Sequence, residues 1–264
     1  MTSIRDFARF KAEGRKISMV TAYDAWTARL VARSRVDAVL VGDSAAMVMH
    51  GHATTLPVTV RQMALHTSAV ARVLDGKFLV ADLPFLSVRK GRRVAMDAVG
   101  ALMTSGAHAV KIEGVDGHEA VIRHIVESGV PVMGHVGLTP QAVHGLGGFH
   151  VQGRSDDEAA HVRRQAKALE RLGCFALVLE CVPARLATCI TREAQIATIG
   201  IGAGAGTDGQ ILVLQDLWGV PTTGHVPRFV RSYLDGERVL TDALDRYDTD
   251  VKGTRFPCPE ESYP

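Results

Sequence analysis

Short apolar runs recur along the chain and are separated by longer segments that carry the signals of helices. Each run holds four or five residues, mostly aliphatic and β-branched, which is typical of a strand buried on both faces. We predict eight such strands, at 17–21, 38–41, 78–81, 109–112, 130–133, 176–179, 196–199 and 211–214. Because parallel strands need helical crossovers, eight strands alternating with helices predict a (β/α)8 TIM barrel of the α/β class.

The segments between the runs contain helix starts and stops. Ser155 and Glu158 form a capping-box pattern, in which both side chains satisfy free backbone N–H groups, and Gly173 is placed to end that helix. Only the gap between 199 and 211 is too short for a long helix. No linker or low-complexity segment divides the chain, so we predict that 1–264 form a single barrel domain. Further helices are expected to begin near Thr59 and Asp116 and to end near Gly76 and Gly129.

Composition and charge are those of an ordinary globular protein. The 264 residues are 47% hydrophobic and 22% charged, and 30 basic against 28 acidic residues leave a formal net charge of +2. This balance gives no sign of a nucleic-acid surface, and no apolar run is long enough to span a membrane. The first sixteen residues lack the uncharged stretch of a signal peptide, and the four cysteines show no zinc spacing. We therefore expect a cytoplasmic protein with no nucleic-acid or membrane partner.

Four predicted strands are followed by a carboxylate, directly at Asp82, Glu113 and Glu180 and after one glycine at Asp43. A buried charge is costly, so these acids should lie at the strand ends, where barrels carry their ligand sites. One Asp there is often only a helix N-cap, but four acids at four strand ends indicate a shared site. Hard oxygen ligands without a thiolate or a histidine pair favour Mg²⁺ or Mn²⁺. Lys111, on the same strand face as Glu113, could hold a substrate carboxylate.

Other polar features near the strand ends are weaker signals. Tyr23 and His135 also follow predicted strands. The glycine-rich stretch 200–206 resembles a phosphate cradle, but a tight turn explains it equally well. His50 and His52 form an isolated HxH, which is more often a loop contact than a metal site.

A set of longer motifs is specific enough to compare with a known family. They are TAYD at 21–24, GDS at 42–44, GHATTLPVT at 51–59, ADLPF at 81–85, KIEG at 111–114, GHVGLTPQ at 134–141, VLECVP at 178–183, and IGIGAG at 199–204 with DGQIL at 208–212. In this order, and over nearly the whole chain, they resemble the ketopantoate hydroxymethyltransferase family.

The resemblance implies a Mg²⁺-dependent barrel enzyme of pantothenate biosynthesis. Such enzymes move a one-carbon unit from 5,10-methylenetetrahydrofolate onto 3-methyl-2-oxobutanoate and form 2-dehydropantoate. It also implies a homodecamer built from two pentameric rings. Carried over residue by residue, the resemblance places Asp43, Asp82 and Glu113 at metal positions, some acting through water. It places Asp43, Ser44, Asp82 and Lys111 at substrate positions, His135 among the active-site residues and Glu180 at the proton acceptor.

The residue types agree with this chemistry. A 2-oxo acid can chelate a metal through its keto oxygen and one carboxylate oxygen, and the metal then stabilises the enolate that forms when a C3 proton leaves. Glu180 has no metal role and is free to take that proton. Three alternatives stay open. They are a hydroxymethyltransferase for another 2-oxo acid, a Mg²⁺-dependent C–C lyase of the isocitrate lyase and phosphoenolpyruvate mutase type with a reactive loop cysteine, and a silent paralogue that only binds a 2-oxo acid.

Overall fold

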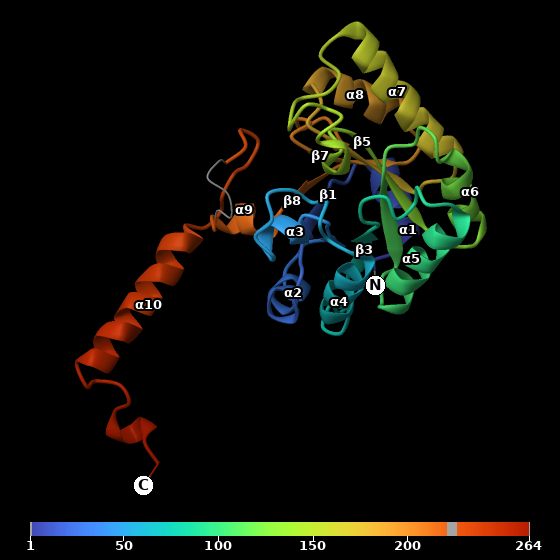
Figure 1. Cartoon of the computed structure of the whole chain (residues 1–264). Coiled ribbons are helices and arrows are strands. Elements are labelled where there is room, and N and C mark those ends of the chain that lie inside the picture. The colour runs from blue at the N-terminus through green and yellow to red at the C-terminus, as the bar shows by residue number, and fades with distance from the viewer. Residues whose placement is uncertain (1, 221–225, 264) are drawn as a thin grey trace. The chain divides into compact units, whose positions relative to one another are not determined.

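The computed structural model describes residues 2–220 and 226–263. The chain divides into two compact units, Met1–Val213 and Leu214–Pro264 (Figure 1). All eight strands belong to the first unit.

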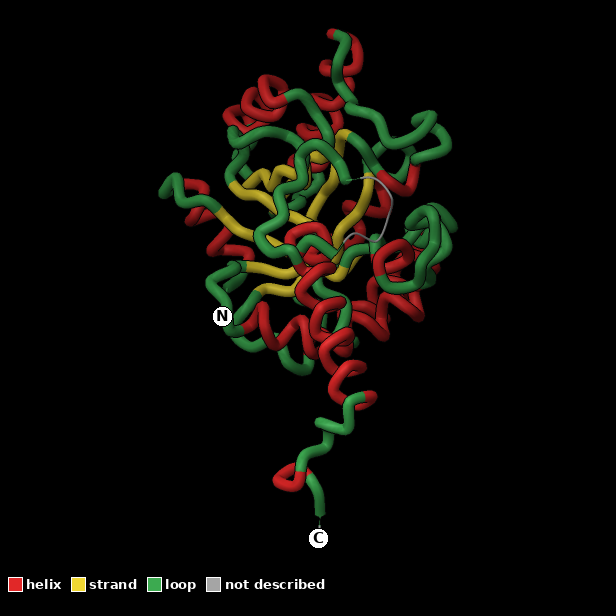
Figure 2. Tube along the Cα trace, turned by 90° about the vertical axis from the view of Figure 1, so that its left-hand side faces the viewer, coloured by secondary structure: helices red, strands yellow, loops and turns green. Residues whose placement is uncertain are grey.

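Eight parallel strands close into a barrel, with each strand paired to its neighbours in chain order and β8 paired to β1. In the barrel unit the strands form the inner layer and the helices lie outside it (Figure 2). The predicted (β/α)8 TIM barrel is confirmed. The strands are β1 (Ile17–Thr21), β2 (Ala38–Val41), β3 (Phe78–Asp82), β4 (Ala109–Glu113), β5 (Val132–Gly137), β6 (Ala176–Glu180), β7 (Ala197–Ile201) and β8 (Gly209–Leu212).

Three strands begin or end two or more residues from their predicted bounds: β5, β8 and β7, which ends at Ile201 rather than at 199. β5 begins at Val132 and continues to Gly137, beyond the expected end at 133, because its second half reads Gly-His-Val-Gly and lacks an apolar run. β8 begins at Gly209, two residues earlier than expected, since glycine and glutamine hide its start from a hydrophobicity pattern. Between β7 and β8 the described chain has no helix, as the short gap predicted.

The helices of the first unit follow the predicted signals closely. The Ser155 and Glu158 capping box is present at the start of α7, and Gly173 has the predicted left-handed φ of 91°. Thr59 caps α4, but this helix ends at Ala71 rather than near Gly76, and α6 is preceded by His118 rather than Asp116. The helices are α1 (Ile4–Ala12), α2 (Ala25–Ala32), α3 (Ala45–Val48), α4 (Val60–Ala71), α5 (Arg92–Thr104), α6 (Glu119–Glu127), η1 (Pro140–Ala142), α7 (Asp156–Arg171) and α8 (Ala184–Glu193).

Helix α1 fills the amino-terminal end of the barrel. Its Phe7 packs edge-to-face against Phe78 and Phe175, with ring centroids 5.6 and 5.3 Å apart, and these residues lie at or just before strand starts. Phe7 and Phe10 join the core that runs through the barrel interior. One end of the barrel is thereby closed with apolar rings, which leaves the carboxyl ends of the strands for polar chemistry.

The second unit consists of α9 (Leu214–Trp218), α10 (Gly236–Lys252) and η2 (Pro259–Glu261). The barrel itself occupies only the first unit, and the expectation that 1–264 form a single domain stays a prediction. In the described part of the chain, every helix is too short or too polar to traverse a bilayer.

Candidate active site at the carboxyl ends of the strands

The register of the barrel brings the predicted site residues side by side. Asp82 on β3 is paired with Lys111 on β4, and Glu113 on β4 is paired with His135 on β5. Asp82, Glu113 and Glu180 are the last residues of their strands, and Asp43 follows the end of β2 by two residues. The four acids therefore share one mouth of the barrel, as parallel register requires.

A close approach between two strands fixes the backbone at Glu180. Gly137, the last residue of β5, is paired with Glu180 and has φ of 94°. A Cβ at this position would collide with the carbonyl oxygen of Glu180. Only glycine meets both demands, and it keeps the end of β6 tight against β5.

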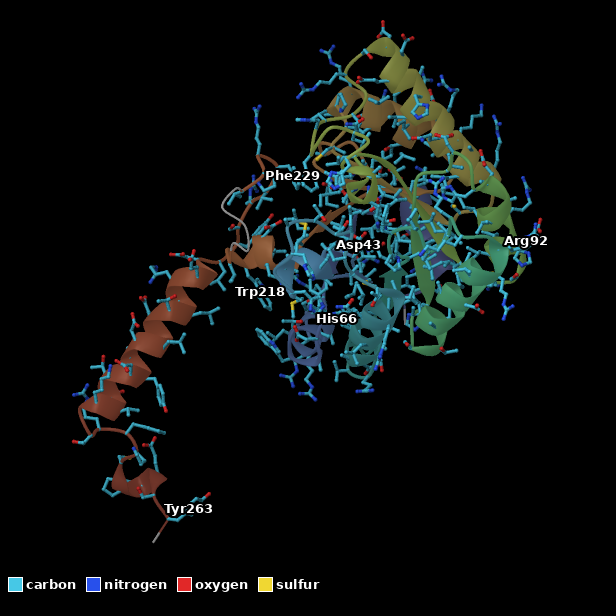
Figure 3. All side chains as sticks on the ribbon, in the orientation of Figure 1. Asp43, His66, Arg92, Trp218, Phe229 and Tyr263 are labelled. Atoms are coloured by element: carbon cyan, nitrogen blue, oxygen red, sulfur yellow. The ribbon has the colours of Figure 1, made fainter. Side chains whose placement is uncertain are left out.

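Burial at this mouth is deeper than the sequence suggested. The residues Asp43, Asp82, Lys111, Glu113 and His135 are only 4, 2, 4, 9 and 1% exposed. Figure 3 shows Asp43 in the middle of the barrel unit, far from the edge where Arg92 points outward. Buried charges are tolerated when they are paired, so the partners of these groups decide what the site can do.

Lys111 is the central cation of the cluster. Its Nζ lies 2.8 Å from Asp82 Oδ1 and 3.7 Å from Glu113 Oε1. Burial lowers the pKa of Lys111, but the charges of Asp82, Glu113 and Asp43 outweigh that cost and raise it above its ordinary value. Lys111 is therefore a fixed positive charge among three carboxylates.

The carboxylates are in excess over this lysine. Burial, together with the charges of Glu113 and Asp82, raises the pKa of Asp43 well above its ordinary value. Burial also raises the pKa of Asp82, although Lys111 opposes the shift. An added cation would relieve this repulsion and favour the ionised forms.

His135 lies between two carboxylates. Its Nδ1 is 3.5 Å from Glu113 Oε1, and its Nε2 is 3.3 Å from Glu180 Oε2. Burial and Lys111 lower the pKa of His135, but Glu113 and Glu180 outweigh them and raise it to about 9. The 3.2 Å contact between Lys111 Nζ and His135 Nδ1 suits a neutral ring instead. Because a carboxylate faces each ring nitrogen, we take His135 as cationic at neutral pH.

Two residues complete the site without having been assigned a role from the sequence. The hydroxyl of Tyr23 lies 2.8 Å from Ser44 Oγ. Gln141 donates its side-chain N–H to Asp43 Oδ2 at 2.8 Å and its backbone N–H to Glu113 Oε2 at 2.9 Å. Gln141 is the last residue of the GHVGLTPQ motif. It does not directly follow a predicted strand, so the position of the strand ends did not predict that it lies in the site.

The donor set suits a hard divalent cation. Asp43, Asp82 and Glu113 offer only oxygen atoms, and Glu113 Oε1 is buried without a hydrogen bond from any described residue. Within 2–220 and 226–263, however, no three His, Cys, Asp or Glu side chains are grouped closely enough to ligate one ion together. Mg²⁺ usually keeps several waters and takes one or two carboxylates directly, so this arrangement fits a partly hydrated ion.

The two weaker sequence signals have structural explanations. In the glycine-rich stretch, a Cβ at Gly200 within β7 would collide with Thr207 Oγ1, and a Cβ at Gly206 in the following loop would collide with Thr188 Oγ1. Close packing therefore explains these two glycines. His50 Nε2 lies 2.9 Å from His66 Nε2, so the HxH motif makes a contact with α4.

A cavity of about 780 Å³ opens beside the carboxylates. Glu113 and Gln141 form part of its wall, and Phe85, Leu86 and Val115 give it apolar surface. Phe85 and Leu86 are 40 and 39% exposed. The cavity has room for a reactant larger than a small 2-oxo acid.

Replacing Asp43 with asparagine should stabilise the metal-free protein while weakening its cation binding. An acid whose pKa is raised by folding costs stability as the pH rises above its ordinary value, here 3.8. We expect Asp43→Asn to raise the free energy of unfolding at pH 7 by about 1 kcal/mol, because it removes a buried charge that Glu113 and Asp82 repel. Urea denaturation after chelation measures this change, and a less stable variant would contradict the proposed charge excess.

Comparison with known sequences identifies close relatives. A family model described as ketopantoate hydroxymethyltransferase matches residues 1–259. The 3-methyl-2-oxobutanoate hydroxymethyltransferase of Bdellovibrio bacteriovorus is 52% identical over 263 residues, which cover 100% of both chains. The enzyme of the same name from Coxiella burnetii (strain CbuG_Q212) is 51% identical over 253 residues, 96% of this chain and 95% of its own.

Solved structures with the same fold are more distant in sequence. Phosphonopyruvate hydrolase, solved with oxalate and Mg²⁺, has a TM-score of 0.64 at 11% identity and covers 99% of this chain and 93% of its own. A 2,3-dimethylmalate lyase of the PEP mutase/isocitrate lyase superfamily has a TM-score of 0.59 at 14% identity, covering 100% and 93%. At this identity the likeness establishes a common barrel fold.

Proposed function

The chain belongs to the ketopantoate hydroxymethyltransferase family, and we propose that it transfers a hydroxymethyl group from 5,10-methylenetetrahydrofolate to 3-methyl-2-oxobutanoate, giving 2-dehydropantoate. The proposal rests mainly on one observation: three buried carboxylates, Lys111 and the His135–Glu180 pair lie together at one mouth of the barrel. The carboxylates and Lys111 can bind a 2-oxo acid, and Glu180 can remove a proton from it.

Asp43, Asp82 and Glu113 would hold the divalent cation, with water completing its coordination. Their excess of negative charge over Lys111 and their oxygen-only donor set support this assignment. When bound, Mg²⁺ would supply positive charge beside the keto oxygen while the C3 proton leaves.

Lys111 and Ser44 would position the 2-oxo acid. The Lys111 ammonium is buried and charged, so it can pair with the substrate carboxylate in a region of weak screening. The Ser44 hydroxyl is oriented by Tyr23 OH at 2.8 Å and can complete the contact. Both groups hold the substrate in one orientation, which favours reaction at C3.

Glu180 would take the C3 proton. Its side chain is 17% exposed, more than those of Asp82 and Glu113, so it faces the more open part of the mouth. His135 Nε2, 3.3 Å from Oε2, orients the carboxylate. Loss of the proton makes C3 nucleophilic. C3 then forms a bond to the folate methylene carbon while one of the two C–N bonds of that carbon breaks, and the released nitrogen keeps the electron pair and takes up a proton. Cleavage of the remaining C–N bond with addition of water releases the hydroxymethyl product and tetrahydrofolate.

The cavity beside Glu113 would admit the folate. Its volume of about 780 Å³ and its apolar wall at Phe85 and Leu86 suit a flat heteroaromatic ring.

Homodecameric assembly and a cytoplasmic location are further proposals, supported by the family resemblance and by the sequence composition.

A C–C lyase of the isocitrate lyase type is the second candidate, favoured by the shared barrel fold. Its reactive cysteine has no good counterpart at this site. Cys181 follows Glu180 directly, but burial and the Glu180 charge raise the pKa of its thiol to about 12. Relatives that share 51 and 52% of their residues with nearly the whole chain are named hydroxymethyltransferases. We therefore prefer hydroxymethyl transfer to C–C bond cleavage as the reaction.

A turnover assay tests the proposal. We expect the protein to form 2-dehydropantoate from 3-methyl-2-oxobutanoate and 5,10-methylenetetrahydrofolate when Mg²⁺ is present, to lose this activity after chelation, and to recover it when Mg²⁺ is restored. Parallel assays with other 2-oxo acids separate the related transferases. Full turnover without metal would contradict the cation site, and the absence of folate-dependent turnover with every 2-oxo acid would contradict the function.

A further inference from the structure

Gln141 contacts two of the carboxylates proposed to hold the cation. Its Nε2 donates to Asp43 Oδ2 at 2.8 Å and to the carbonyl oxygen of Leu83 at 2.9 Å, and its backbone N–H donates to Glu113 Oε2 at 2.9 Å. One residue therefore joins the ends of β2, β3 and β4. Among the described residues, the Gln141 side chain is the hydrogen-bond donor to the Asp43 carboxylate.

The segment that carries Gln141 is fastened to the site at both ends. It connects β5 to α7, and Leu138 near its start donates a backbone hydrogen bond to the Glu180 carbonyl at 2.9 Å. Near its end, the Gln152 backbone N–H donates to the Cys181 carbonyl at 2.9 Å. These two hydrogen bonds hold the segment against the end of β6, which carries Glu180, the proposed base. The backbone at Gln141 is therefore held in place, and its side-chain amide contacts Asp43 from a defined position.

We propose that Gln141 is a positioning residue for the cation, acting through Asp43. The inference rests on the proposed function, because it assumes that Asp43 is a cation ligand. The Gln141 amide occupies one oxygen of Asp43 and fixes the direction of the carboxylate, as hydrogen-bonding partners of metal ligands do.

The chemistry of the side chain fits this role. A neutral amide donates to a carboxylate without adding charge to a cluster that already holds an excess of acids. Glutamate at this position would instead add a fourth negative group beside Asp43, and asparagine would be one methylene too short to reach both Asp43 and Leu83.

Binding of Mn²⁺, followed by its electron paramagnetic resonance signal, tests the inference in the full-length protein. Gln141→Met keeps the length of the side chain and the backbone bond to Glu113 but removes the donor to Asp43. We expect it to weaken Mn²⁺ binding about 10–100-fold, the usual cost of losing such a partner. Gln152→Met is the matched control, because among the described residues the Gln152 side chain donates to the His150 carbonyl and not to a carboxylate of the site, and it should bind Mn²⁺ as the wild type does.

A double-mutant cycle separates positioning from general loosening of the fold. In the Asp43→Asn background, Gln141→Met should cause no further loss of Mn²⁺ affinity, because Gln141 acts through the carboxylate that is already gone. An equal loss in both backgrounds, or an unchanged affinity of Gln141→Met alone, would overturn the inference while leaving the cation site in place. Failure of the wild type itself to bind Mn²⁺ would overturn the inference together with the proposed cation site.

Discussion

Replacing Lys111 with methionine is expected to lower the free energy of unfolding of the metal-free protein by about 3–5 kcal/mol at pH 8, and to abolish turnover. The reason is that Lys111 is the fixed cation among Asp43, Asp82 and Glu113, all of them buried. Without it, three acids would have to be ionised together in a poorly screened region, or be protonated at a cost that rises with pH.

The pH dependence of this loss has a definite sign. In the folded protein the pKa values of Asp43 and Asp82 are raised, so each costs stability increasingly as the pH rises above its ordinary value of 3.8. Removing Lys111 raises these pKa values further, so the deficit of Lys111→Met should be smaller at pH 5 than at pH 8.

Urea denaturation of the chelated protein at the two pH values measures both effects. Lys90→Met is the control, because Lys90 is exposed, and its effect should stay within about 0.5 kcal/mol. If Lys111→Met were no more destabilising than Lys90→Met, Lys111 would not be neutralising the cluster.

The second large effect is expected at Glu180. Glu180→Gln keeps the size of the side chain but removes the proposed base, and a positioned general base typically contributes about 10²–10⁴-fold in rate. We expect kcat for hydroxymethyl transfer to fall by this factor while the affinity for 3-methyl-2-oxobutanoate changes little, since Lys111 and the cation site are untouched.

Steady-state kinetics and equilibrium binding of the 2-oxo acid distinguish the two effects. Glu127→Gln, an exposed glutamate at the end of α6, is the control for the substitution itself and should leave kcat unchanged. Undiminished turnover of Glu180→Gln would move the base to another group, and His135 would be the next residue to test.

Hydrophobic patterning predicted the barrel because buried parallel strands are nearly uniform apolar runs, and seven of the eight strands lie within two residues of their expected bounds. It failed at the end of β5 and the start of β8, where the strand residues are glycine, histidine and glutamine. His135 and Val136 at the end of β5 are buried, but the residue types of these two segments form no apolar run, so only the backbone pairing with neighbouring strands identifies them as strand.

The acidic strand ends were predictable for the same reason, since each acid interrupts an apolar run. The hydrogen bond between Gln141 and Asp43 was not predictable, because it joins residues 98 positions apart and depends on the path of the segment between β5 and α7. The depth of burial also escaped prediction. Strand-end position alone does not reveal that Asp43 and Asp82 are only 4 and 2% exposed.

The central claim is that this barrel mouth removes the C3 proton of a bound 2-oxo acid, and proton exchange in D₂O tests it most directly. Protein, Mg²⁺ and 3-methyl-2-oxobutanoate are incubated without folate, and the loss of the C3 proton signal is followed by NMR. We predict exchange with the wild type, none after chelation, and a rate about 10²–10⁴-fold lower with Glu180→Gln. Absence of exchange in the Mg²⁺-loaded wild type at saturating substrate would contradict the account.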